Sequence, residues 1–430
     1  MKKIHFVGIG GIGMSGLARF LAAKGIEVSG SDTDKNSEIL QELEAEKITI
    51  FHQHEAKNIS SDISEIIFSE AIPEKNRERL RGKELKITQK NFFQKLGEVS
   101  KKFRVIAVAG THGKSTTTAM IAKIFEQADL DPAVILGTKI FEWGNKNVRI
   151  HKKKSDQEKK YFILEACEYR ENFLQIFPEI VVVTNCEAEH LDFFKNAKNY
   201  FRAFAKFADL GKILVANFSD NKINKIFKNF SGTKISYSDF LPKVLPLKIP
   251  GKHNIENAAA AMAVGSFFQI PIKKINQSLQ NFRGTWRRFE KKGEKNGIKV
   301  FDDYAHHPTE IRSTLEAFRE IFPTEKLWVV FQPHQFSRTR FFLKQFAKSF
   351  TDADEILIPN IYRVRDKEEE TKKNSLQNLI KEIKKNGKKV RHSKNFETTV
   401  KILQQEILPG EILVSMGAGP IFEVADKFLE

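Results

Sequence analysis

The chain has 430 residues, of which 41% are hydrophobic and 29% are charged. This is an ordinary globular composition, and at roughly 100–200 residues per domain the length predicts two to four domains. The net charge of +17 favours nucleic acid or phosphorylated substrates as partners. The lysines are scattered, however, with only short runs such as residues 152–154 and no basic stripe interleaved with aromatics, so nucleic-acid binding is not expected.

The chain has two cysteines, Cys167 and Cys186, which are too few for a disulfide framework. Its first apolar segment, residues 3–7, reads as a strand rather than as a targeting segment. No apolar stretch reaches the roughly 20 residues that a membrane helix needs. We therefore expect a cytoplasmic protein without membrane insertion.

Strands and helices alternate along the chain in three successive units, which predicts parallel sheets covered by helices. The first unit has a strand at 4–7, a glycine turn at 8–16, a helix at 17–24 and strands at 26–29 and 63–68. The second has strands at 105–109, 161–164, 180–184 and 212–216 and an alanine-rich helix from about Asn257. The third has strands at 299–301, 327–331, 355–358 and 412–415, with a charged, exposed loop at 363–374.

The glycine turn of the first unit fits the pattern G-x-G-x-x-G between a strand and a helix. Its glycines let the backbone approach a diphosphate, and the helix N-terminus supplies N–H groups. Asp32 follows about 20 residues later, where a ribose-binding acid is expected. NAD is the default ligand of this pattern, but any nucleotide diphosphate satisfies the same physics. The alternative is that the glycines only permit close strand–helix packing.

The second unit carries a phosphate-binding loop directly after its first strand. The loop consists of Gly110, Thr111, His112, Gly113, Lys114, Ser115 and Thr116. Its backbone N–H groups suit phosphates, Lys114 neutralises β- and γ-phosphate oxygens, and the Ser115 hydroxyl suits Mg²⁺. Val108 stands where the standard pattern has glycine, so the match is to a shorter variant. This loop predicts an ATP-consuming enzyme.

Polar residues at strand ends surround this loop in the predicted sheet. Glu165 ends one strand and His190 follows the next, so both are expected at the same sheet edge, where a carboxylate is a natural Mg²⁺ ligand. Asn254 and Asn257 lie three residues apart at a helix start, so both amides can face one purine edge. Helix capping is the alternative for the two asparagines.

The third unit concentrates charged and aromatic residues at two strand ends. The segment at residues 287–290 offers a cation for a transferring phosphoryl group. Residues 302–308 combine two acids, a phenol and two imidazoles, a density that is seldom structural. Residues 331–339 end another strand and include Arg338.

Together, these motifs resemble the Mur ligase family over nearly the whole chain, and their order and spacing are specific. The markers are residues 8–16, 30–32, 110–118, 165–168, 251–257, 287–290 and 302–308. The resemblance implies an α/β protein of three domains: a Rossmann-like UDP-sugar-binding domain (residues 1–100), a central ATPase-like domain with a mostly parallel sheet (101–284) and a Rossmann-like amino-acid-binding domain (285–430).

The resemblance also implies a reaction. The lactyl carboxylate of UDP-N-acetylmuramate attacks the γ-phosphate of ATP to give an acyl phosphate, and the amine of L-alanine then displaces phosphate. The implied cofactor is Mg²⁺ or Mn²⁺, and we expect a monomer or weak dimer. A recycling ligase of the same family, which attaches a tripeptide, is the first alternative, and a non-enzymatic UDP-sugar sensor is the second. A dehydrogenase does not explain the phosphate loop.

The resemblance assigns roles to individual residues. Those implied for the UDP-sugar are Gly8, Gly10, Gly11, Gly13, Met14, Ser15 and Asp32. Those implied for ATP are the seven residues of the phosphate loop with Asn254 and Asn257 at the adenine, and those for the metal are Ser115, Glu165 and His190. Those implied for catalysis are Lys114, Arg288 at the γ-phosphate, Asp303 orienting the nucleotide, and His306 as the group that takes the amine proton. Those implied for the amino acid are Tyr304, His306 and Arg338.

The chain departs from the family pattern at a few positions. Ala305 replaces a usual glycine, and Pro420 stands where an aspartate is common. Gln335 stands where many relatives have a second arginine, so Arg338 is expected to carry more of the amino-acid binding.

Overall fold

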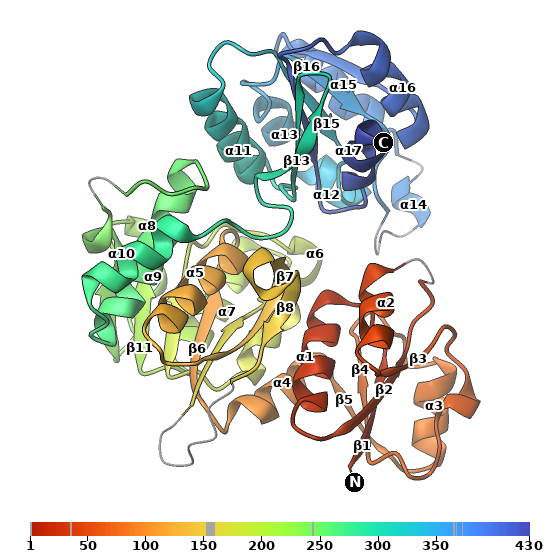
Figure 1. The fold of residues 1–430 in the computed structure, drawn as a ribbon, viewed down its shortest axis with the longest axis vertical. Coiled ribbons are helices and arrows are strands. Elements are labelled where there is room, and N and C mark those ends of the chain that lie inside the picture. Colours follow the sequence, from red (N-terminus) through yellow and green to blue (C-terminus); the bar gives the residue numbers. More distant parts are fainter. Residues whose placement is uncertain are drawn as a thin grey trace. The chain divides into compact units, whose positions relative to one another are not determined.

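A computed structural model describes residues 2–34, 37–151, 160–242, 245–363, 366, 368–371 and 373–430. The lysine run at 152–154 and part of the charged segment at 363–374 lie outside these residues. The chain divides into two compact units, residues 1–246 with 255–282, and residues 247–254 with 283–430. Within the described residues, three separate sheets form the framework, two in the first unit and one in the second (Figure 1).

The N-terminal sheet is entirely parallel, with the strand order β3-β2-β1-β4-β5. Its strands are β1 (Lys3–Val7), β2 (Glu27–Ser31), β3 (Thr49–Phe51), β4 (Glu65–Phe68) and β5 (Thr88–Asn91). Its helices are α1 (Ile12–Ala22), α2 (Glu38–Ala45), α3 (Arg77–Glu84) and α4 (Phe92–Ser100). From β1 the chain adds β2 and β3 on one side of the sheet, and then β4 and β5 on the other. The glycine turn that follows β1 therefore lies at the switch point where ligands bind in open parallel sheets.

The central sheet has the order β12-β11-β10-β6-β9-β7-β8 and is parallel except for the edge strand β8. Its strands are β6 (Arg104–Ala109), β7 (Ala133–Ile140), β8 (Lys146–Arg149), β9 (Tyr161–Glu165), β10 (Ile180–Val183), β11 (Ile213–Ala216) and β12 (Thr233–Ser236). Its longer helices are α5 (Lys114–Gln127), α7 (Ala197–Ala208), α9 (Lys252–Phe267) and α10 (Ile272–Asn281), with the short helices α6 (Leu191–Phe194) and α8 (Asn221–Ile226). The central strands β6, β9 and β10 are runs of buried apolar residues, as expected for strands covered on both faces.

The C-terminal sheet has the order β13-β14-β18-β15-β16-β17 and is parallel except for the hairpin strand β13. Its strands are β13 (Glu290–Lys295), β14 (Ile298–Asp303), β15 (Leu327–Phe331), β16 (Glu355–Ile358), β17 (Lys389–His392) and β18 (Ile412–Met416). Its helices are α11 (Pro308–Ile321), α12 (Phe336–Phe341), α13 (Leu343–Lys348), α14 (Glu368–Thr371), α15 (Ser375–Lys385), α16 (Phe396–Glu406) and α17 (Phe422–Leu429). Separate clusters of buried apolar side chains cover the two faces of this sheet, which therefore has a core of its own.

The N-terminal and central sheets share one apolar core within the first unit. A buried polar junction joins them as well: the Arg19 guanidinium of α1 bonds to Glu42, to Glu46 and, at 3.0 Å, to the Asn147 side-chain oxygen of β8. A buried arginine with several partners loses them together when the junction opens, so this contact favours one arrangement.

The predicted strands are present, with bounds that agree or shift by one or two residues. Two predicted helix starts are wrong: α1 begins at Ile12 rather than at residue 17, and α9 begins at Lys252 rather than near Asn257. Gly13 and Gly16 lie inside α1 despite the low helix propensity of glycine. A Cβ at these positions would press against Phe92 and Asn147, so close packing explains why glycine stands there. The domain bounds 1–100, 101–284 and 285–430 stay a prediction.

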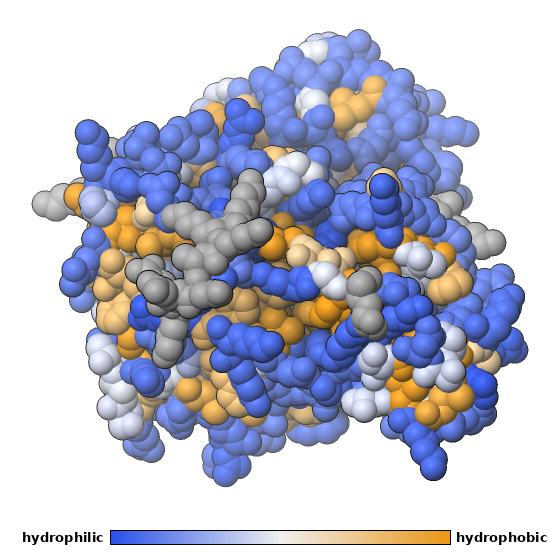
Figure 2. Space-filling view, turned by 60° about the horizontal axis from the view of Figure 1, so that its bottom comes forward, coloured by the Kyte–Doolittle hydropathy of each residue, from blue (hydrophilic) through white to orange (hydrophobic). Residues whose placement is uncertain are grey.

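Charged and polar side chains cover most of the molecular face drawn in Figure 2, with apolar side chains in patches between them. Among the described helices, none combines the length and the apolar composition needed to cross a membrane.

Candidate active site

The glycine turn after β1 is held by hydrogen bonds to the end of β2. Gly8 has φ +83°, in the left-handed region that favours glycine, and its N–H donates to the Ser31 carbonyl at 2.8 Å. The Gly10 N–H donates to Asp32 Oδ2, also at 2.8 Å. The helix α1 follows Gly11, with no side chain capping its N-terminus. The turn therefore places the N-terminus of α1, whose backbone N–H groups suit a diphosphate, next to a carboxylate that suits a ribose hydroxyl.

Two residues predicted for the UDP-sugar have buried side chains. Met14 belongs to the apolar core, and Ser15 is fully buried, with its hydroxyl donating to the Ile12 carbonyl at 2.9 Å. Asn147 of β8 also contacts Ser15 Oγ, at 3.4 Å. Both side chains thus support α1 from the interior.

The phosphate loop connects β6 to α5 in the predicted way. Gly113 has φ +77°, and a Cβ there would lie 2.3 Å from Asn257 Oδ1, so only glycine fits. The helix α5 begins at Lys114 without a side-chain cap. Its first backbone N–H groups and the positive end of its dipole therefore face the loop.

Side chains that follow β10 hold the backbone of the phosphate loop in place. The Asn185 amide both accepts from the His112 N–H (2.9 Å) and donates to the His112 carbonyl (3.0 Å). The Thr111 hydroxyl bonds to the Glu187 backbone and, at 2.9 Å, to the hydroxyl of buried Tyr200. The loop and the segment that leads to His190 therefore form one hydrogen-bonded assembly.

Lys114 lies buried among oxygen atoms. Its ammonium donates to the Gly110 carbonyl at 2.6 Å and pairs with the buried Glu168 carboxylate at 3.2 Å. Burial alone would lower the pKa of Lys114, but the charges of Glu168, Glu165 and Glu189 outweigh it and raise the pKa above its ordinary value. Lys114 is therefore a permanent positive charge at the loop.

Ser115 and Glu165 are brought together, as the predicted metal site requires. The Ser115 hydroxyl donates to Glu165 Oε2 at 2.8 Å, and the same oxygen accepts from the Gly137 N–H at 3.0 Å. A hydroxyl beside a carboxylate at a phosphate loop offers the hard oxygen ligands that Mg²⁺ prefers. Ser115 and Glu165 therefore fit the Mg²⁺ ion that accompanies ATP.

His190 lies in a second cluster that the sequence reasoning did not find. Its Nε2 is 3.6 Å from Glu168 Oε1 and 3.6 Å from Glu189 Oε2, and one ligand atom from each residue lies within 4.8 Å of the others. Burial raises the pKa of Glu168, but Lys114 and His190 outweigh it and leave the pKa below its ordinary value. These two carboxylates and the imidazole also suit a divalent cation.

The two predicted adenine ligands occupy different surroundings. Asn257 accepts a hydrogen bond from the Thr117 hydroxyl of α5 at 3.1 Å and packs against Gly113. Asn254 donates to the Pro250 carbonyl at 2.6 Å, which fixes the turn that enters α9. Both side chains are buried.

At the end of β14, a buried ion pair fixes the neighbouring glycine turn. Arg287 donates to Asp302 Oδ2 at 2.6 Å and to the carbonyls of Gly417 and Gly419 at 2.7 and 2.9 Å. Ser415 also donates to Asp302. The turn after β18 is therefore attached to the strand end that carries the acids.

Asp303 is buried and holds the backbone on both sides of it. Its oxygens accept from the N–H groups of Phe289 and Ala305, each at 2.8 Å. Burial raises the pKa of Asp303 to about 6, although the Arg288 charge and these N–H groups act in the opposite direction. Asp303 thus positions the residues next to Arg288 and Tyr304.

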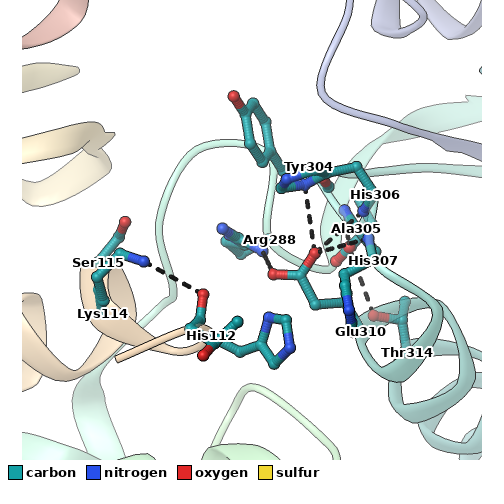
Figure 3. A network of polar contacts seen from close by, with 12 residues as sticks. His112, Lys114, Ser115, Arg288, Tyr304, Ala305, His306, His307, Glu310 and Thr314 are labelled. Carbon is teal, nitrogen blue, oxygen red and sulfur yellow. Dashed lines mark hydrogen bonds and ion pairs between the residues drawn. The ribbon is translucent and has the colours of Figure 1, made fainter. Parts of the chain in front are cut away.

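Arg288, Tyr304 and His306 are grouped around Glu310 at the start of α11 (Figure 3). One Arg288 nitrogen lies 3.6 Å from Glu310 Oε1, and the Arg288 guanidinium lies over the Tyr304 ring at 5.1 Å. The His306 and Tyr304 rings meet edge to face at 5.4 Å. The sequence reasoning did not single out Glu310.

Arg338 lies on α12, which follows β15. Its charge acts on Tyr304. Burial raises the pKa of Tyr304 above its ordinary value, and the charges of Arg287, Arg288 and Arg338 offset only part of this rise. His334 lies between β15 and α12, and its ring is 5.9 Å from the ring of His306. Tyr304, His306 and Arg338, the residues predicted for the amino acid, therefore meet at one edge of the C-terminal sheet.

Comparison with known proteins identifies the family. Three family models match in chain order: the Mur ligase family catalytic domain (residues 3–104), the Mur ligase middle domain (108–244) and the Mur ligase glutamate ligase domain (287–419). The chain belongs to the Mur ligase family.

Relatives within that family are similar over the full chain. UDP-N-acetylmuramate–L-alanine ligases from Clostridium kluyveri and Caldanaerobacter subterraneus subsp. tengcongensis are 38% and 39% identical to it, with 100% of this chain and 98% and 97% of theirs covered. The solved UDP-N-acetylmuramate-alanine ligase MurC from Thermotoga maritima superimposes with a TM-score of 0.82 and 27% identity, covering 100% of this chain and 98% of that one. A murein peptide ligase from Psychrobacter arcticus, at 22% identity and a TM-score of 0.74, shares the fold.

Proposed function

We propose that this chain joins L-alanine to the lactyl carboxylate of UDP-N-acetylmuramate at the expense of ATP, giving UDP-N-acetylmuramoyl-L-alanine, ADP and phosphate. The observation that carries the proposal is the full-length likeness to ligases of that name. The phosphate loop, the two acidic clusters and the group around Glu310 supply the chemistry that such a reaction needs.

The first step is the transfer of the γ-phosphoryl group to the carboxylate. The phosphate loop binds the nucleotide through backbone N–H groups, Lys114 stabilises charge on the phosphates, and Asn254 and Asn257 bind the adenine. Ser115 with Glu165, and His190 with Glu168 and Glu189, would hold Mg²⁺ or Mn²⁺, which screens the repulsion between the carboxylate and the phosphates. Arg288 reaches the transferring group, and Asp303 keeps its neighbours in place.

The second step is the attack of the alanine amine on the acyl phosphate. Arg338 binds the alanine carboxylate, because a guanidinium forms two parallel hydrogen bonds with it. His306 accepts the proton that the amine must lose. Tyr304 borders the same site, and the glycine turn at residues 8–13 with Asp32 binds the UDP diphosphate.

Arg338→Lys is expected to raise the KM for L-alanine about tenfold or more, with the KM values for ATP and UDP-N-acetylmuramate little changed. Lysine keeps the charge but loses the two-pronged geometry, and a tenfold change corresponds to ~1.4 kcal/mol. His306→Ala should instead lower kcat. Arg340→Lys, the same exchange on the same helix, is the matched control. An unchanged alanine KM in Arg338→Lys, or a parallel rise of all three KM values, would show that Arg338 is not the carboxylate anchor.

Phosphate release tests the choice between L-alanine and a peptide. With UDP-N-acetylmuramate and ATP present, release should depend on L-alanine. The tripeptide that a murein peptide ligase attaches should not replace it at the same concentration. Release that depends on the tripeptide and not on L-alanine would assign the chain to the peptide ligases.

A further inference from the structure

The carboxylate of Glu310 contacts two of the residues proposed for catalysis. Its Oε2 lies 3.2 Å from His306 Nδ1 and accepts from the His306 N–H at 3.1 Å. Its Oε1 lies 3.6 Å from Arg288. The side chain is 9% exposed, so water screens these contacts little. Figure 3 shows Glu310 beside Arg288 and His306.

Helix capping explains only part of this arrangement. Glu310 is the third residue of α11, and its carboxylate accepts from the N–H of the N-cap residue His307 at 3.2 Å, which completes a capping box. The capping box of α4 does the same with Gln94, which is exposed and uncharged. A capping box therefore needs no charge, and the contacts of Glu310 with the His306 ring and with Arg288 are additional to it.

The contacts of the His306 ring determine which nitrogen can take a proton. Its Nδ1 has two oxygen acceptors, Glu310 Oε2 at 3.2 Å and the Tyr304 carbonyl at 3.1 Å. Two acceptors at Nδ1 favour the neutral tautomer with the proton on that nitrogen, which places the basic lone pair on Nε2. The titratable rings of Tyr304 and His334 also lie against the His306 ring.

We propose that Glu310 is a positioning residue of the amino-acid step, which holds His306 as the Nδ1–H tautomer, stabilises its protonated form and fixes Arg288. This inference rests on the proposed function. When the alanine nitrogen bonds to the acyl carbon, the carbon–oxygen bond to phosphate breaks and phosphate leaves. The nitrogen loses a proton to His306 Nε2, and the Glu310 charge stabilises the imidazolium that results.

Glu310→Gln separates this role from capping, because glutamine still accepts backbone N–H bonds but carries no charge. We expect kcat to fall by about tenfold, since one pKa unit corresponds to a tenfold change in an equilibrium. The acidic limb of the pH–rate profile should move to lower pH by about one unit or more, because loss of a neighbouring negative charge lowers the pKa of an imidazolium. The KM for UDP-N-acetylmuramate should stay unchanged.

Gln94→Ala, which removes the corresponding side chain of the α4 capping box, is the control and should leave kcat and the pH profile unchanged. A Glu310→Gln variant with wild-type kcat and pH profile, whatever its melting temperature, would overturn the proposal and leave Glu310 as a capping residue.

A second measurement does not depend on activity. In an NMR titration, with the His306 signal assigned by its loss in His306→Ala, the pKa of His306 should be lower in Glu310→Gln than in the wild type by about one unit. An unchanged His306 pKa would overturn the proposal. A lowered pKa in a protein whose wild type releases no phosphate with L-alanine would support the coupling of Glu310 to His306 and reject the proposed function.

Discussion

Lys114→Ala is expected to abolish phosphate release while leaving the fold intact. Lys114 is buried beside Glu168, and the surrounding carboxylates raise its pKa, so it is charged at any assay pH. Its loss removes a positive charge from the phosphates as their charge shifts in the transition state. Such a loss costs about 3–4 kcal/mol, or roughly a hundredfold to a thousandfold in rate.

The matched control is Lys123→Ala, which lies on the same helix and pairs with Glu126 near the surface. It should keep nearly full activity. Circular dichroism and the melting temperature would show whether both variants are folded. Near-normal phosphate release by a folded Lys114→Ala variant would contradict the assignment of the loop to ATP.

Arg287→Met is expected to lower the free energy of unfolding of the C-terminal unit by about 3–5 kcal/mol. Arg287 and Asp302 are buried almost completely, and the methionine would leave the Asp302 charge with the hydrogen bond from the Ser415 hydroxyl but without its guanidinium. The carbonyls of Gly417 and Gly419 would lose their donor as well. Breaking such a pair is costly because the remaining charge stays out of water.

Tryptophan fluorescence in a denaturant titration can follow this unit. In a Trp143→Phe background, both remaining tryptophans, Trp286 and Trp328, belong to the C-terminal unit. Arg391→Met breaks a half-exposed pair with Glu406 and should cost less than about 1 kcal/mol. The double variant Arg287→Met with Asp302→Asn should recover part of the loss. Equal effects of Arg287→Met and Arg391→Met would mean that the buried pair contributes no more than a surface pair.

Strands buried on both faces could be predicted from the sequence, whereas the edge strands could not. The strand β15, Leu327–Phe331, is a continuous apolar run and has the predicted bounds. The edge strand β13 has the sequence EKKGEK, and β5 has TQKN. Such polar strands form because the adjacent strand supplies backbone hydrogen-bond partners. The pattern of apolar residues in the sequence does not indicate these partners.

Some residues of the candidate site could likewise be predicted from the sequence, and others could not. The phosphate loop was predicted because its chemistry lies in seven consecutive residues, and the contact between Ser115 and Glu165 follows from the meeting of strand ends at one sheet edge. Glu189 and Glu310 were missed because each gains its role from side chains that only the folded chain brings near. The ligand-binding roles assigned to Met14, Asp32 and Asn254 stay a prediction.

The most direct test follows oxygen from the substrate carboxylate. UDP-N-acetylmuramate labelled with ¹⁸O in its lactyl carboxylate would be incubated with ATP, Mg²⁺ and L-alanine, and both products analysed by mass spectrometry. An acyl phosphate requires that one labelled oxygen leave with phosphate, so we expect singly labelled phosphate and UDP-N-acetylmuramoyl-L-alanine in equal amounts. Unlabelled phosphate, or labelled phosphate without the alanine product, would contradict the proposed ligation.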